Sequence, residues 1–255
     1  VCSSDLIPSI DQYPFIKNEL LFAQKAYFKE YGIKGAYKQF RPNIGRPWSR
    51  NVVHQYSKTG IGLEIGVGER TIAPVSRTIL SDAFKSHGAD KTSLAKVFFK
   101  ADKIPYEDDS FGFVFSEHAL EHLSNPLKAL FHWKEKLTVG GFLILFIPHQ
   151  KRCCDIYRKR TPMAHIVDDY KKNIQDDDQT HVDDFYENVV LKGLTPHYEH
   201  LKKEELARSG NMHHHVWVPE DLVELLNYVG LETVYSEDCV PDRRDSFVIV
   251  GQKKS

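Results

Sequence analysis

The first stretch that could do chemistry is a glycine-rich turn. In GLEIGVGER, Gly66 and Gly68 end a strand-like segment, residues 61–65, which is typical of a loop that approaches a ligand closely. Dinucleotide-binding loops commonly carry a third glycine, but Arg70 stands at that place, next to Glu69. A carboxylate there competes with a phosphate, because the free N–H groups and dipole of a helix start attract anions. The loop therefore favours a ligand with a sulfonium or an amine and no phosphate.

Acidic residues also close the expected strands. Glu64 lies at the end of the first, Asp82 closes the second, and Asp102 follows the third. In open α/β sheets, ligands bind outside the carboxyl ends of the strands. Asp82 is placed to accept hydrogen bonds from a ribose diol, and Asp102 is placed to reach an adenine amine. Each of these acids alone could be an ordinary solvated residue, but their shared position favours a binding role.

The elements that would position these acids alternate between strand and helix. Expected strands cover residues 61–65, 78–81, 96–99, 111–115 and 141–147, with a helix over 119–137. This alternation predicts an α/β fold with a parallel sheet and helices on its faces. Four regions follow from the pattern: an N-terminal helical cap (1–58, with a helix expected within 13–40), a core (59–149), a polar insertion (150–215), and a C-terminal helix and hairpin (216–255).

Composition excludes several classes of protein. The chain has 255 residues, 41% of them hydrophobic and 27% charged, which is enough to bury a large core. A formal net charge of −1 gives no field that would attract nucleic acid. The longest apolar run, 142–147, is too short to cross a bilayer, and the start lacks a signal-peptide pattern. The four cysteines have neither zinc-finger nor disulfide-scaffold spacing, which indicates reduced thiols and a cytoplasmic location. We expect a small-molecule partner, no nucleic acid and no membrane; the oligomeric state stays open.

Several motifs together resemble one family. LEIGVG, KADKIPYEDDSF, FGFVFSEHALEHLSNPLKAL and LTVGGFLILFIP, in this order, resemble the class I S-adenosylmethionine-dependent methyltransferases of the methyltransferase type 11-like group. The resemblance covers residues 60–149 and the C-terminal helix and hairpin. It implies a doubly wound Rossmann-like sheet with a terminal antiparallel hairpin, the N-terminal cap, and the insertion as a lid over the cleft. The implied cofactor is S-adenosylmethionine, with S-adenosylhomocysteine as the product.

The resemblance also assigns the cofactor-binding residues. Glu64, Gly66, Val67 and Gly68 should hold the methionine and ribose end, Asp82 the ribose hydroxyls, and Asp102 with Lys103 the adenine edge; Ser116 completes the set. Two features depart from the family pattern. Arg70 replaces the third glycine, and the first helix, between Gly68 and Thr78, is unusually short. The amino-acid end of the cofactor is therefore open to a different mode of binding.

A competing motif lies in the same region. HALEH, residues 118–122, fits H-x-x-E-H, the inverted zinc-peptidase signature. His118 and His122 would share a helix face at this spacing. However, His118 directly follows a strand, and no distant carboxylate ligand or peptide groove is identifiable. We therefore prefer the methyltransferase interpretation, in which Glu121 and His122 tie the helix down by hydrogen bonds.

The insertion should hold the methyl acceptor. It contains CCDIYRKRTPMAHIVDDY, DDDQTHVDDF and NMHHHVW, and this arrangement resembles an uncharacterised bacterial branch of the family that is suspected of acting on glycans or other polar metabolites. Arg158, His165, His181 and His214, one of three adjacent histidines, would line a polar pocket suited to O-methylation of a sugar or glycan precursor. A divalent metal held by this His/Asp cluster is an alternative, which we do not expect because the cluster lacks a fixed ligand spacing.

Histidines are the candidates for the catalytic base. In an in-line displacement at a sulfonium the leaving group needs no help, so the protein supplies alignment and, for a hydroxyl acceptor, a base. His149 in FIPHQ, at the end of the expected fifth strand, is the first candidate, and His118 at the end of the fourth is the second. His149 could equally be a loop histidine bonded to backbone. A methyltransferase-like protein that binds cofactor or a partner without catalysis remains the alternative function.

Overall fold

A seven-stranded sheet forms the centre of the molecule. The computed structural model describes residues 46–86, 92–195 and 202–255, and the helix expected within 13–40 lies outside these ranges. The strand order is β3-β2-β1-β4-β5-β7-β6. The strands are β1 (Gly62–Ile65), β2 (Thr78–Asp82), β3 (Val97–Phe98), β4 (Phe111–Glu117), β5 (Leu137–Pro148), β6 (Glu232–Glu237) and β7 (Ser246–Gln252). Strand β7 pairs antiparallel with β5 and β6, and the other pairs are parallel. The predicted Rossmann-like sheet with a terminal antiparallel hairpin is confirmed.

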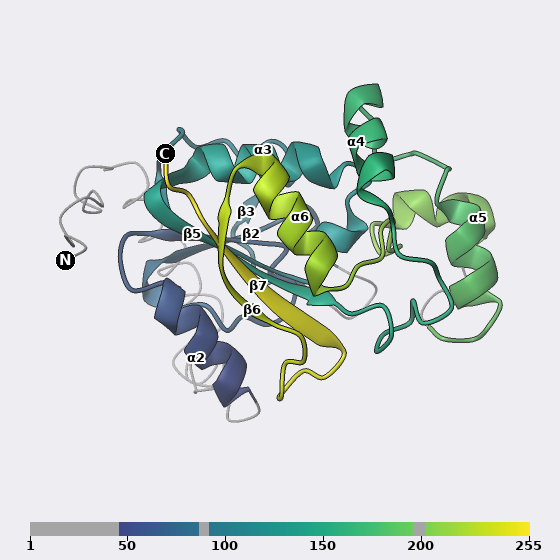
Figure 1. Ribbon diagram of the computed structural model, residues 1–255, viewed down its shortest axis with the longest axis horizontal. Helices are drawn as coiled ribbons and strands as arrows, with labels where there is room; N and C mark the ends of the chain where they lie inside the picture. Colours follow the sequence, from purple (N-terminus) through teal and green to yellow (C-terminus); the bar gives the residue numbers. More distant parts are fainter. Residues whose placement is uncertain (1–45, 87–91, 196–201) are drawn as a thin grey trace.

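Helices cover both faces of this sheet. Figure 1 shows α3 (Pro126–Lys136) and α6 (Pro219–Val229) on one face and α2 (Pro47–Tyr56) on the other. The α3/α6 face holds the larger apolar core, which includes the fully buried Trp133. The α2 face holds a second core, in which Val53 packs with aromatic residues of β4 and β5. Since β1 and β4 are buried along nearly their whole length, their apolar sequences fit central parallel strands.

Helix ends are fixed by the residues that the sequence places there. Asn125 caps α3, its side-chain oxygen accepting a hydrogen bond of 3.1 Å from the Lys128 N–H. Helix α6 begins with Pro219 and ends at Gly230, which adopts the left-handed conformation with φ of 78°. The start of α3 and both ends of α6 are thus set by residues at the helix termini.

Two expected helices differ in the structure. The chain between β1 and β2 holds only a 3₁₀ turn, η3 (Val75–Arg77), and no α-helix among the described residues of this connection. The helix expected over 119–137 begins at Pro126, because proline is favoured in the first turn and breaks a helix interior. Residues before it form the 3₁₀ turn η4 (Leu120–His122). Both predictions were therefore wrong in extent, and the cavity is bordered by loops where helices were expected.

The insertion has a small core of its own. It contains α4 (Met163–Lys172), α5 (Val182–Phe185), a π-helical turn η5 (Tyr186–Val190) and the 3₁₀ turns η7 (Lys203–Glu205) and η8 (Ala207–Ser209). Figure 1 shows α4 and α5 gathered beyond one end of the sheet. The buried apolar residues of this small core are Val182, Phe185, Val189, Leu206, Ala207 and Met212. Within the described part of the chain, no helix is long and apolar enough to span a bilayer.

A close contact between β1 and β4 leaves no room for a side chain at Gly62. A Cβ added to Gly62 would lie 2.0–2.5 Å from three ring atoms of the buried Phe113, its register partner. We expect Gly62→Ala to lower the free energy of unfolding by about 1–3 kcal/mol through overpacking, measured by urea denaturation. In a Phe113→Leu background the same change should cost less, since the ring is gone. An equal cost in both backgrounds would contradict the clash.

Candidate active site

A cavity of about 890 Å³ opens at the carboxyl ends of β1, β2 and β4. This volume is within the range of small-molecule sites, roughly 300–1,000 Å³. Among the residues expected to bind cofactor or substrate, those that line it are Glu64, Gly66, Val67, Gly68, Asp82, Asp102, Lys103, His118 and His214. Ser116 is buried beneath it, and its hydroxyl donates to the Ile65 carbonyl at 3.2 Å. Strand order therefore brings most of the predicted residues to one edge of the sheet.

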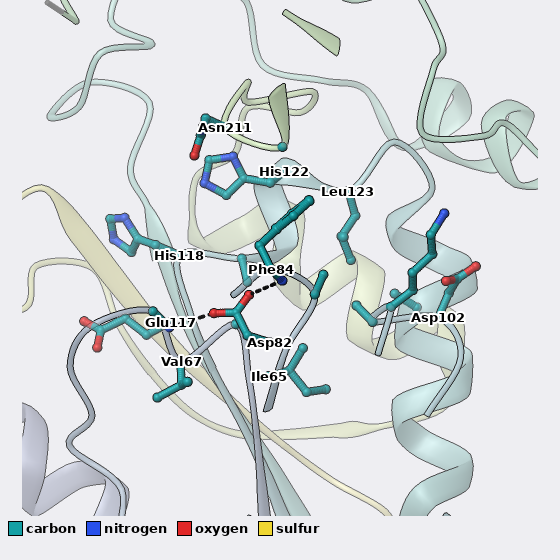
Figure 2. A pocket seen from close by; sticks show the side chains of 18 of the residues that line it. Ile65, Val67, Asp82, Phe84, Asp102, Glu117, His118, His122, Leu123 and Asn211 are labelled. Carbon is teal, nitrogen blue, oxygen red and sulfur yellow. Dashed lines mark hydrogen bonds between the residues drawn. The ribbon is translucent and has the colours of Figure 1, made fainter. Parts of the chain in front are cut away.

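Asp82 joins separate loops beneath the cavity. Its carboxylate accepts hydrogen bonds from the Gly68 N–H at 3.0 Å, the Phe84 N–H at 3.1 Å and the Ser93 hydroxyl at 2.9 Å. The residue is only 3% exposed. Figure 2 shows Asp82 between Asp102 on one side and Glu117 and His118 on the other. Gly68 has φ of 54°, so the turn that donates to Asp82 requires glycine.

Negative charge is concentrated at the β1 and β4 strand ends. Glu64 is buried, and its pKa is raised well above the ordinary value by burial and by the charges of Glu117 and Asp82. The Thr71 hydroxyl donates to Glu64 and partly offsets this rise. A cationic group beside Glu64 would favour its charged form.

Two arginines line the same region, which the sequence interpretation missed. Arg46 lies 2.5 Å from Glu117, and Arg243 also pairs with this carboxylate. Beside them, Asp242 accepts a hydrogen bond of 3.1 Å from the Ser49 N–H. Glu117 could have been found as another strand-end acid. Its partners come from the α2 start and the β6–β7 connection, which no local pattern links to β4.

The opposite end of the cavity is partly apolar. Phe99, Ala101 and Leu123 line it together with Asp102, whose carboxylate lies 2.9 Å from the Lys128 ammonium. A flat apolar ring with a polar edge fits such a surface. Lys103 is exposed at the rim.

His118 has unusual backbone geometry at the cavity wall. Its φ is 53°, a left-handed conformation uncommon outside glycine and asparagine. Its Nε2 lies 2.6 Å from the Ser246 hydroxyl, which itself donates to Asp245 at 2.7 Å. Because that hydroxyl proton is directed to Asp245, Nε2 is the donor toward Ser246 and Nδ1 holds the lone pair. Burial, together with the charge of Arg243, lowers the pKa of His118 well below its usual range, so the ring is neutral near pH 7.

The HALEH segment does not form the helix face of a zinc peptidase. His118 directly follows β4 and His122 lies in the 3₁₀ turn, so the two residues do not share a helix face. His122 Nδ1 donates to the Met212 carbonyl at 3.1 Å, tying this turn to the insertion. Glu121 is buried, and neither carboxylate oxygen makes a hydrogen bond to a described residue, so its expected tethering role was wrong. Burial raises the pKa of Glu121 to about 7.

His149 does not line this cavity. Its ring is buried, with Nδ1 accepting from the Lys151 N–H at 3.0 Å and Nε2 lying 3.2 Å from Asp238. Burial, followed by the charge of Arg152, lowers its pKa. The structure thus separates the two histidines expected near the transferred methyl group.

The insertion contributes a different set of lining residues from those expected. Arg158, His165 and His181 do not line the cavity, whereas Ile174, Gln175, Asp176, Asp177, Ala207, Gly210 and Asn211 do, with His214. Arg158 is instead buried within the insertion, where it pairs with Asp155 at 2.8 Å and Asp184 at 2.7 Å. Figure 2 shows Asn211 and His122 on the opposite side of the pocket from Asp82. Composition indicated a polar pocket, but not which side chains would face it.

A family comparison gives the same reading of the core. Residues 66–145 match the model of a methyltransferase domain family. An uncharacterized protein of Methanocaldococcus jannaschii is 34% identical over 91 residues, covering 34% of this chain; the chain spans 44% of that relative's length. The chain carries a methyltransferase domain. This match agrees with the predicted resemblance to the class I S-adenosylmethionine-dependent methyltransferases.

Solved structures resemble the chain over most of its length at low identity. A SAM-dependent methyltransferase of Thermotoga maritima is 18% identical with a TM-score of 0.45, covering 92% of this chain and 100% of its own. The 1,6-didemethyltoxoflavin-N1-methyltransferase of Burkholderia thailandensis, with bound 1,6-didemethyltoxoflavin and S-adenosylhomocysteine, is 10% identical with a TM-score of 0.49. This second match covers 97% of this chain and 92% of the Burkholderia thailandensis chain.

The methyltransferase domain should show a pH dependence due to Glu121. Its pKa rises from the ordinary 4.5 to about 7 on folding, so folding favours the protonated form. The resulting stability is complete below about pH 4.5 and is lost as pH rises through about 7. Glu121→Gln should therefore be stabilising at about pH 8, by on the order of 3 kcal/mol, and the gain should disappear at acidic pH.

Differential scanning calorimetry across this pH range measures the difference in Tm between Glu121→Gln and the native chain. Glu220→Gln, which changes an exposed carboxylate, is the matched control and should give a difference independent of pH. A pH-independent difference for Glu121→Gln as well would contradict the assignment.

Proposed function

We propose that this chain transfers the methyl group of S-adenosylmethionine to a hydroxyl of a polar small molecule, such as a sugar or glycan precursor. The observation that carries the proposal is that strand-end carboxylates of the methyltransferase domain and polar residues of the insertion line one continuous cavity. The strand-end carboxylates thus suit the cofactor, and the polar residues of the insertion suit an acceptor.

The cofactor end fits S-adenosylmethionine by its charges. The ligand has a sulfonium and an ammonium, and a cation beside the buried Glu64 would favour its charged form. Asp82 holds the glycine turn, where ribose is expected, and Asp102 stands beside an apolar surface suited to adenine. Bound there, the cofactor supplies an electrophilic methyl group, while these residues orient it.

The acceptor end supports a hydroxyl-rich molecule. Gln175, Asp176, Asn211, His122 and His214 also line the cavity, and they supply both donors and acceptors. Such a surface favours a sugar over an aromatic or lipid acceptor. The insertion acts in this proposal as the lid over the site, as its cavity-lining residues suggest.

His118 is the proposed base. It lines the cavity, whereas His149 does not. The Asp245–Ser246–His118 hydrogen-bond chain fixes the proton on Nε2 and leaves Nδ1 to accept the hydroxyl proton. The resulting imidazolium would have Glu121 Oε1 at 3.8 Å from Nδ1, which favours the charged form.

We expect Asp82→Ala to weaken S-adenosylmethionine binding about 10- to 100-fold, equivalent to charge-assisted hydrogen bonds of about 1.5–3 kcal/mol. The physical reason is that the turn at Gly68 and the loop at Phe84 lose their common anchor. Isothermal titration calorimetry with S-adenosylmethionine and S-adenosylhomocysteine measures the affinity. Glu232→Ala, at an exposed strand end, is the control. Unchanged affinity in a folded Asp82→Ala protein would remove the assignment.

His118→Asn should lower turnover by about 10²–10⁴-fold while leaving cofactor affinity nearly intact. Asparagine is chosen because it tolerates the left-handed backbone at this position. A panel of sugars and nucleotide sugars, followed by the mass increase of one methyl group, provides the assay. His149→Asn is the matched control and should retain turnover; the reverse pattern would return the base to His149. Cofactor binding without methylation of any acceptor would favour the non-catalytic alternative.

A further inference from the structure

Two histidines and one aspartate of the insertion converge on a point outside the cavity. His165 and Asp169 are four residues apart on α4, so their side chains share one helix face. His181 immediately precedes α5. None of these three residues lines the cavity of the candidate active site. The cluster therefore requires an explanation separate from methyl transfer.

The three facing atoms have the spacing of metal ligands. His165 Nε2 lies 3.4 Å from His181 Nε2 and 3.3 Å from Asp169 Oδ2, and His181 Nε2 lies 3.7 Å from the same oxygen. Ligand bonds to zinc of about 2.0–2.2 Å at tetrahedral angles place ligand atoms roughly 3.3–3.6 Å apart. One ion can thus contact all three atoms with little movement.

The aspartate oxygen at this point has no hydrogen bond. Asp169 is 3% exposed, and Oδ2, which faces both imidazoles, makes no hydrogen bond within the part of the chain that the structure describes. A buried carboxylate oxygen without a donor is costly. At most one proton can lie between the two facing nitrogens. A cation would satisfy the oxygen and both nitrogens simultaneously.

We propose that His165, Asp169 and His181 bind one divalent transition-metal ion, with Zn²⁺ as the preferred occupant. Imidazole favours zinc and its neighbours over Mg²⁺ or Ca²⁺, which prefer oxygen ligands. The side chain of His165 is 41% exposed, which gives an ion and a fourth, solvent ligand access to the site.

Two other groups of donors share His213, one with Glu121 and His122 and one with Cys153, Cys154 and Asp155. In the second group the donor atoms are already used, because His213 Nδ1 lies 2.6 Å from Asp155. The same aspartate also accepts from Arg158. A metal there would have to displace a buried ion pair, whereas the His165–Asp169–His181 cluster needs no such exchange.

The position of the ion indicates a structural role. The loop between the ligands contains Ile174, Gln175, Asp176 and Asp177, all of which line the cavity. Asp169 and His181 flank this loop, and Asp176 also pairs with Lys100 of the core at 2.5 Å. A metal that joins the two ends of the loop would restrict its conformations and so hold this wall of the cavity in place.

Zinc binding to the full chain, made metal-free with a chelator and dialysed, tests the proposal. Competition with a chromophoric chelator should show one tight equivalent of Zn²⁺, and excess Zn²⁺ should raise Tm by several degrees. Cobalt(II) should give the intense visible absorption of four- or five-coordinate Co²⁺. His165→Ala and Asp169→Asn should weaken zinc binding by more than the ~10–100-fold attributed to loss of an outer partner of a metal ligand.

Two control variants identify the site. His54→Ala removes an exposed histidine on α2 and should bind zinc like the native chain. His213→Ala removes both competing clusters, together with the His213–Asp155 pair, and should also retain tight binding. Absence of tight zinc binding to the native chain would overturn the proposal. Loss of binding in His213→Ala with retention in His165→Ala would overturn it equally. Circular dichroism of each variant confirms that it is folded.

Discussion

The cavity depends on the hydrogen bonds of one buried carboxylate. Asp82 accepts from the turn after β1, from the backbone after β2 and from the Ser93 hydroxyl further along the chain. A crossover helix normally provides such anchorage through its own backbone hydrogen bonds, but the β1–β2 connection has only a 3₁₀ turn. Hydrogen bonds to a charged acceptor are stronger than those between neutral groups, so they can replace the anchorage of a helix. Three of them offset the desolvation of the Asp82 carboxylate.

Adjacent histidines of the insertion are in opposite electrostatic environments. Burial alone would lower the pKa of His213, but the bonded Asp155 carboxylate raises it well above the ordinary value. Burial and the nearby His181 lower the pKa of His214 to about 3, and His215 is shifted in the same direction. His213 is thus a structural cation, whereas His214 faces the cavity as a neutral donor or acceptor. The three residues that look like one motif have different physical roles.

Periodicity predicted the sheet because apolar strands of this length pack in few ways. Its order brings Glu64, Asp82 and Asp102 together, so the positions of the strand ends predicted the cavity. His149 was predicted wrongly on the same basis, because β5 ends at Pro148 and the next residue pairs with Trp217, outside the cavity lining. In the insertion, periodicity carried little information. Contacts such as Arg158 with Asp184 or Arg46 with Glu117 connect residues far apart in sequence, and no local pattern encodes them.

The insertion has few apolar residues to bury, so polar interactions must define its shape. Six residues form its buried apolar cluster. Beside them, Arg158 donates to Asp155, Asp184 and the carbonyls of His213 and His214, so this buried cation makes four hydrogen bonds. Buried ion pairs add little net stability, but they disfavour alternative packings in which one charge would lose its partner. This network fixes the backbone that carries Gly210 against Phe84 at the cavity wall. The side chain of Asn211 lines the cavity but is not part of this network. A different residue at such a position would change the cavity surface and leave the backbone of the wall in place.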